Sequence, residues 1–139
     1  MAELVIRPLT GETWDALSGL FGRAGASNGC WCQYWRLGPR YHDRARDLNR
    51  EELELEARRG SPAPGLVAFE GSAAVGWCRV GPRAALPWLE RARGLGPLDG
   101  APVWSLPCFF VGRAHRGRGV SGELIEAAVA FARDAGAPA

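Results

Sequence analysis

The stretch CFFVGRAHRGRGVSGELI, Cys108 to Ile125, decides the fold of this chain. It begins as an apolar strand, passes through a turn rich in glycine and arginine, and enters an amphipathic helix that ends near Gly136. Glycines let the backbone approach a ligand closely, and the first amides of a helix are donors without partners in the helix. The stretch therefore predicts a strand, turn and helix that bind an anion such as a phosphate.

The strand before this turn carries an irregularity of its own. The apolar run Val103–Val111 is hydrophobic enough to be central in a sheet, but Pro107 interrupts it. Because proline cannot donate a ladder hydrogen bond, we expect a bulge there, or a place where the strand parts from its neighbour.

Outward from this unit, the hydrophobic pattern predicts the remaining elements. Asn49 with Glu52 forms a capping-box pattern, Ser121 is a plausible N-cap for the last helix, and Gly136 stands where a C′ glycine belongs. The expected elements are a strand at Leu4–Leu9, helices over 13–24, 49–60 and around 85–92, a hairpin of Leu66–Glu70 and Ala73–Val80 joined by Gly71 and Ser72, and a helix after Ser121.

Length and composition describe an ordinary globular chain. At 139 residues and 47% hydrophobic it is long enough to form one domain with its own core. No run of about 18 apolar residues predicts a membrane span, and the charged start MAELVIRPLT does not fit a secretory signal, so we expect no membrane partner and a cytoplasmic location. A net charge of +2 is too small to predict general binding to nucleic acid. The arginines of GRAHRGRG lie in one turn rather than along an extended basic surface, so no nucleic-acid partner is expected.

The glycine and arginine turn resembles the acyl-CoA signature of the GNAT superfamily of N-acetyltransferases. The family pattern Arg/Gln-x-x-Gly-x-Gly/Ala falls on Arg116, Gly119 and Ser121. A bacterial subgroup of that superfamily carries an early CWC-x-YWR segment, which this chain also has. The resemblance implies a single α/β domain over 1–139, with a mixed, largely antiparallel central sheet, a bulged fourth strand and flanking helices.

The resemblance also implies acetyl-CoA as cofactor and an amine of a small molecule or protein as substrate. Backbone groups of Phe109, Phe110 and Val111 would pair with the pantetheine arm, and the turn amides would hold the pyrophosphate. The residues implied in cofactor binding are Phe109, Phe110, Val111, Arg116, Gly117, Arg118, Gly119, Val120, Ser121 and Gly122. An alkylammonium must lose a proton before it attacks the thioester, so the reaction needs a base or a chain of waters.

The chain departs from the family pattern in two places that bear on activity. Ser105 stands where some members have a glutamate base, so no catalytic residue is assigned. The sequence ends at Ala139, before the fifth and later strands of the family. Either the protein continues, or a partner such as a second copy in a homodimer completes the fold. A domain that binds acyl-CoA without turnover is therefore the alternative function.

The early segment GCWCQYWR, Gly29 to Arg36, has three interpretations. A zinc site lacks two clustered partner ligands, and a disulfide between Cys30 and Cys32 would be strained, so no metal is expected and the thiols are expected to be structural. The resemblance places the segment over the acceptor side of the cleft. There Trp31, Tyr34 and Trp35 would bind a cationic amine through their ring faces, or the tryptophans would simply pack the segment onto the domain.

Overall fold

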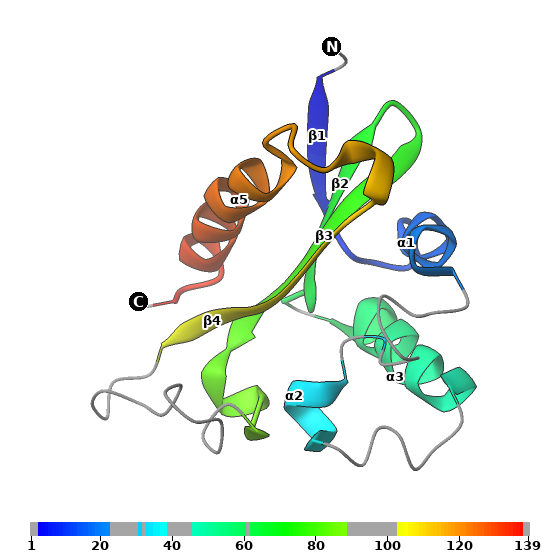
Figure 1. The fold of residues 1–139 in the computed structure, drawn as a ribbon. Coiled ribbons are helices and arrows are strands. Elements are labelled where there is room, and N and C mark those ends of the chain that lie inside the picture. The colour runs from blue at the N-terminus through cyan, green and yellow to red at the C-terminus, as the bar shows by residue number, and fades with distance from the viewer. Residues whose placement is uncertain are drawn as a thin grey trace.

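A computed structural model describes residues 3–22, 31, 33–38, 46–60, 62–88 and 103–137 of the chain. The chain is an α/β domain in which one strand is followed by three helices, then by three consecutive strands and a last long helix (Figure 1). The elements are β1 Leu4–Pro8, α1 Trp14–Phe21, α2 Tyr34–Leu37, α3 Arg46–Arg59, β2 Gly65–Glu70, β3 Ala73–Pro82, β4 Trp104–Val111 and α5 Val120–Asp134, with short 3-10 helices η3 Arg83–Ala85 and η4 Arg113–His115.

The strands form one sheet in the order β1-β2-β3-β4, and all three neighbouring pairs are antiparallel. The predicted hairpin is confirmed, because Glu70 pairs with Ala73 across the turn and Gly71 has a φ of 63°. A positive φ is easy for glycine and costly for other residues, which explains the glycine at this position. The expectation of a largely antiparallel sheet is confirmed.

The bulge expected at Pro107 is present in β4. Arg79 pairs with Cys108 and Gly81 with Ser105, so a three-residue step in β4 faces a two-residue step in β3. The extra residue reverses the alternation of side chains: Leu106 packs on the α5 side of the sheet, whereas Cys108 packs on the opposite side. Proline is tolerated there because the ladder is already interrupted.

Helices cover both faces of the sheet. Figure 1 shows α5 on one side and α1 and α3 on the other. Successive side chains of each strand point to opposite faces of the sheet. Val67 and Trp77 therefore pack with α1 and α3, whereas Leu66 and Cys78 pack with α5. The backbone at Gly65 has room for no side chain, because a Cβ there would lie 2.4 Å from the Trp77 ring.

The predicted start of α3 at Asn49 is wrong. The helix begins at Arg46, and Asn49 lies inside it at 1% exposure. Asn49, Leu53 and Ala57 recur every four residues, so they form the buried stripe of the helix. Packing of this stripe, rather than the capping pattern, determines where α3 runs.

The predicted N-cap of α5 is also wrong, whereas its end is confirmed. The helix begins at Val120 after Gly119, which has a φ of 81°, and Ser121 is exposed in the first turn. At the other end Gly136 has a φ of 91°, and its amide and that of Ala137 donate to the carbonyl oxygens of Arg133 and Ala132 at 3.0 and 2.9 Å. These two bonds are the pair that defines a Schellman C-terminus.

Some expectations fall outside the described residues. They include the second half of the helix expected over 85–92, and Cys30 and Cys32. The short helix α2 was not predicted, because four residues are too few for a periodic pattern. None of the helices in the described ranges has the length and hydropathy of a membrane span.

Candidate functional site

The turn after β4 has the geometry of an anion site. Gly117 and Gly119 have φ values of 78° and 81°, a conformation that side chains disfavour. No side chain caps α5, and the amides of its first turn have no partners within the helix. They open onto a depression of about 260 Å³ formed by the end of β4, the turn and the start of α5. The sequence prediction of a strand, turn and helix is confirmed.

The arginines of this turn are held by protein groups. Arg116 donates from Nε to the carbonyl oxygen of Val111 at 3.0 Å. Arg118 donates from Nη2 to Glu70 Oε2 at 2.9 Å, and its Nη1 lies 3.0 Å from His115 Nδ1. The Arg118 guanidinium therefore ties the turn to the end of the β2–β3 hairpin, and Glu70 is ion-paired rather than simply solvated. These contacts use two of the five N–H donors of Arg118, which leaves its other donors and the backbone amides of the turn for an anion.

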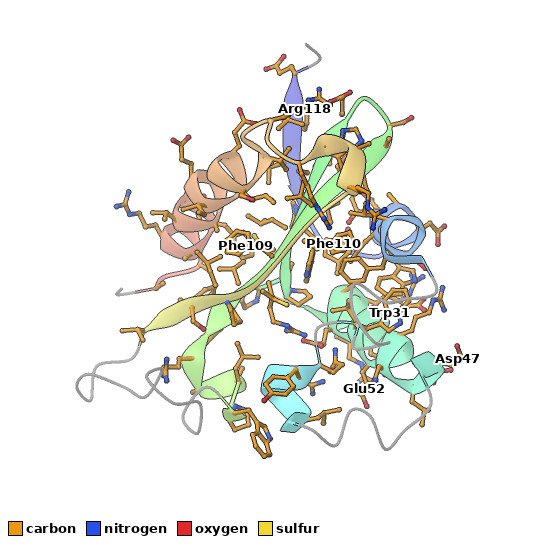
Figure 2. All side chains as sticks on the ribbon, viewed as in Figure 1. Trp31, Asp47, Glu52, Phe109, Phe110 and Arg118 are labelled. Atoms are coloured by element: carbon orange, nitrogen blue, oxygen red, sulfur yellow. The ribbon has the colours of Figure 1, made fainter. Side chains whose placement is uncertain are left out.

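The outer edge of β4 is open in the described part of the chain, where β4 ends the order of the sheet. The Gly112 amide donates to Val75 O of β3 at 2.9 Å. Because the direction of the backbone groups alternates along a strand, those of Phe109 and Val111 point to the outer edge. The bond from Arg116 to Val111 O agrees with this direction. Figure 2 shows Phe109 on the α5 side of β4 and Phe110 on the α1 side.

Trp31 lies in the core. It is 3% exposed, and its ring centroid lies 5.9 Å from that of Trp14 and 5.4 Å from that of Phe21. The Arg50 guanidinium covers the ring at 5.8 Å. The structure thus favours the packing interpretation over a ligand-facing wall for this residue. Tyr34 is 37% exposed on α2, and the side chain of Trp35 lies outside the described residues.

The polar residues of the same segment belong to a network that the sequence analysis missed. Arg79 of β3, 4% exposed, donates to both oxygens of Glu56 of α3 at 2.9 Å. The fully buried Gln33 donates to Glu56 Oε1 at 3.0 Å and accepts a bond from Arg36. An arginine inside the apolar strand AAVGWCRVGP was the signal in the sequence, because a buried charge needs a partner.

The network keeps Glu56 ionised. Burial by itself raises the pKa of the Glu56 carboxyl, but the hydrogen bonds and charge of Arg79, with help from Gln33 and Arg36, outweigh burial and hold the pKa below its ordinary value. A cavity of about 350 Å³ lies beside this network, between α2, the last half of α3 and the end of β3. Glu56, Arg36 and Arg79 form part of its wall.

Two further sequence expectations concern Ser105 and the thiols. The Ser105 hydroxyl is buried at the bulge and has no hydrogen-bond partner among the described residues. Cys78 is a buried free thiol whose pKa burial raises to about 12. A thiol with such a pKa is neutral and unreactive at pH 7, so the structural role expected for Cys78 agrees with its surroundings.

The sequence model of the acetyltransferase (GNAT) family matches residues 30–139, and the chain belongs to this family. A comparison with curated protein sequences finds no match.

Several solved structures share the fold. The aminoglycoside N-acetyltransferase AAC(6')-Iy, in complex with the bisubstrate analogue CoA-S-monomethyl-acetylneamine, is 21% identical with a TM-score of 0.60, over 99% of this chain and 76% of that one. The ribosomal-protein-alanine N-acetyltransferase of Brucella melitensis biovar Abortus 2308 is 18% identical with a TM-score of 0.56, over 98% and 76%. The protein yncA of Salmonella typhimurium, solved with its cofactor acetyl-CoA, is 19% identical with a TM-score of 0.51, over 96% of this chain and 65% of that one. At these identities the likeness concerns the fold.

Proposed function

We propose that this chain is an N-acetyltransferase that transfers acetyl from acetyl-CoA to an amine of a small molecule or protein. The observation that carries the proposal is the uncapped start of α5, which follows two left-handed glycines at the end of a bulged strand with an open outer edge.

The residues present fit the cofactor. The amides from Arg116 to Ser121 would hold the pyrophosphate, because α5 has no side-chain cap that competes for its first amides. The space beside Gly117 and Gly119 is open within 4 Å, so nothing blocks a close approach. The outward backbone groups of Phe109 and the amide of Val111 would bind the pantetheine arm. Acetyl-CoA, when bound, supplies the acetyl group as a thioester.

The alternative is a domain that binds acyl-CoA without turnover. It is favoured by Ser105, since a hydroxyl in the position of a carboxylate cannot act as a base of suitable pKa. Release of free CoA thiol in the presence of a panel of amines separates the two functions. Binding of acetyl-CoA with no thiol release on any amine supports the alternative.

The binding site is tested by placing a negative charge in the first turn of α5. Ser121→Glu adds a carboxylate at the depression, where it competes with a bound phosphate for the helix amides. We expect acetyl-CoA affinity, measured by calorimetry, to fall about tenfold or more with no loss of stability, because acidic residues suit a helix N-terminus. Ala130→Glu, on an exposed part of α5 more than two turns further on, is the control. Equal affinity of the two variants would show that the turn is not the site.

A further inference from the structure

The cavity beside the Glu56 network has the features of a binding site. Its volume of about 350 Å³ lies near the lower end of the range for small-molecule pockets. It is formed by residues far apart in the sequence: Arg36 of α2, Glu52, Glu56 and Arg59 of α3, and the end of β3. This is also where the polar part of the early CWCQYWR segment lies, since Gln33 and Arg36 belong to the network on its wall.

Hydrogen bonds and ion pairs within the protein hold the charged side chains of the cavity wall. Glu56 accepts bonds from Arg79 and Gln33, and Arg36 lies 3.6 Å from the carboxylates of both Glu52 and Glu56. A polar group held by several partners at once loses little freedom when a ligand binds, so such a wall is preorganised. The lining also has an apolar part, with Leu55, Val80 and Leu86 among its residues.

The charge of the lining indicates the chemistry of the ligand. Three guanidiniums, those of Arg36, Arg59 and Arg79, face two carboxylates, those of Glu52 and Glu56. Arg36 and Arg79 are engaged with these carboxylates, whereas Arg59, exposed in the last turn of α3, has no ion pair or hydrogen bond within the described ranges. Guanidinium groups bind carboxylates through paired hydrogen bonds. The surplus positive charge therefore suits a carboxylate.

We propose that this cavity binds the acceptor substrate, and that the acceptor is an amine that also carries a carboxylate on an apolar body, of the size of one or two amino-acid residues. The carboxylate binds Arg59 at the rim and the apolar body lies against Leu55, Val80 and Leu86. The role as acceptor rests on the proposed acetyltransferase function, whereas binding to the cavity is a separate property that needs no acetyl-CoA.

The test measures binding by calorimetry in the absence of acetyl-CoA. The probes are L-leucine, L-methionine and L-phenylalanine, each beside its amide, which keeps the amine and the apolar chain but lacks the negative charge. We expect at least one of the amino acids to bind about tenfold or more tightly than its amide, because hydrogen bonds between charged groups are the strong ones.

The matched variants are Arg59→Gln and Arg58→Gln. Both arginines are exposed in the last turn of α3, but Arg58 pairs with Glu54 at 2.9 Å and does not line the cavity. Arg59→Gln should remove the preference for the acid over the amide, and Arg58→Gln should keep it. The inference is overturned if none of the amino acids binds, if acid and amide bind alike, or if the two variants behave alike. Loss of acetyl-CoA binding and of thiol release would instead overturn the proposed function.

Discussion

At the scale of single residues, the structure separates the aromatic and polar members of one short segment. Trp31 lies in the core and has a φ of 49°, the one positive value at a non-glycine position in the described ranges. Such a conformation costs free energy and persists where the surroundings enforce it. Gln33 and Arg36, which attract less notice in the sequence, contribute to the network beside the cavity.

Replacement of Trp31 by alanine tests the packing role. We expect Trp31→Ala to lower the free energy of unfolding by about 3–5 kcal/mol, because it leaves a cavity among Trp14, Phe21 and their neighbours. Urea denaturation measures the effect. Tyr34→Ala, at an exposed position, is the comparison and should cost about 1 kcal/mol or less. An unchanged stability with a raised KM for the acceptor would restore the role of Trp31 as a substrate wall.

The Glu56 and Arg79 pair gives a second prediction. Glu56→Gln leaves the Arg79 guanidinium, 4% exposed, without its counter-charge. Loss of one partner of a buried pair typically costs about 3–5 kcal/mol, and the partial exposure of Glu56 places the expected cost at the lower end. Glu54→Gln on the same helix breaks two surface ion pairs, with Arg58 at 2.9 Å and with Arg50 at 3.9 Å, and should change stability by about 1 kcal/mol or less. Similar losses in the two variants would contradict a special role for Glu56.

The pH dependence of stability follows from the same carboxyl. The pKa of Glu56 is lower in the folded chain than its ordinary value of 4.5, so ionisation of Glu56 stabilises the fold above pH 4.5. This contribution is lost as the pH falls below 4.5 and through the lower, folded-state pKa. The difference in unfolding free energy between the wild type and Glu56→Gln should therefore shrink over that range. Urea denaturation at a series of pH values measures it, and a constant difference would refute the pKa direction.

At the scale of elements, the backbone of the turn before α5 decides where the helix begins. Val120, Leu124 and Ala128 form the buried stripe of α5, and the left-handed Gly119 directs the chain into it. The Arg118 bond to Glu70 joins this turn to the β2–β3 hairpin, forty-eight residues away in sequence. The anion site is therefore positioned by two elements rather than by the turn alone.

Two glycine substitutions in this turn should have opposite effects. Gly119→Ala places a Cβ on a residue with a φ of 81°, and we expect a loss of about 1–2 kcal/mol. Gly122→Ala lies in the first turn of the α5 helix, with no atom within 4 Å of the new Cβ, and should stabilise by about 0.5–1 kcal/mol. Since neither Cβ meets a neighbour, the comparison isolates backbone conformation. Urea denaturation measures the change in unfolding free energy of both variants. A change of the same sign in both would exclude this explanation.

At the scale of the whole molecule, β1 and β4 are the two edge strands of the sheet in the described part of the chain. Helices cover both faces, and β4 lies at one end of the strand order with its bulge and the anion turn (Figure 1). The proposed cofactor and acceptor sites lie toward opposite ends of β4, at its carboxyl end and beside the end of β3 that pairs with its start.

Hydrogen exchange should report binding along the open edge. The outward amides of Phe109 and Val111 are expected to exchange faster than the inner amides of β2 and β3, because no strand covers them in the described part of the chain. Saturating acetyl-CoA should slow exchange at both amides and in the first turn of α5. Exchange in α3, which lies on the face of the sheet opposite α5, is the internal reference and should not change. Protection confined to the turn would exclude pairing of the pantetheine arm with β4.

Much of the fold could be predicted from sequence because it depends on local patterns. The hairpin around Gly71, the interruption at Pro107, the glycine turn and the end of α5 at Gly136 each follow from residues that are close in the chain. The starts of α3 and α5 were predicted wrongly at Asn49 and Ser121, since burial of a helix stripe outweighed a capping signal worth about 1 kcal/mol.

The sequence by itself determined the family, the order of elements and the anion turn, because glycine conformation and hydrophobic period act over a few residues. Only the tertiary structure decided that Trp31 belongs to the core, that Gln33 and Arg36 join the network beside the cavity, and that Arg118 pairs with Glu70. The physical reason is that Glu56 and Arg79 lie twenty-three residues apart in the sequence. Such charged partners come into contact only when the chain packs.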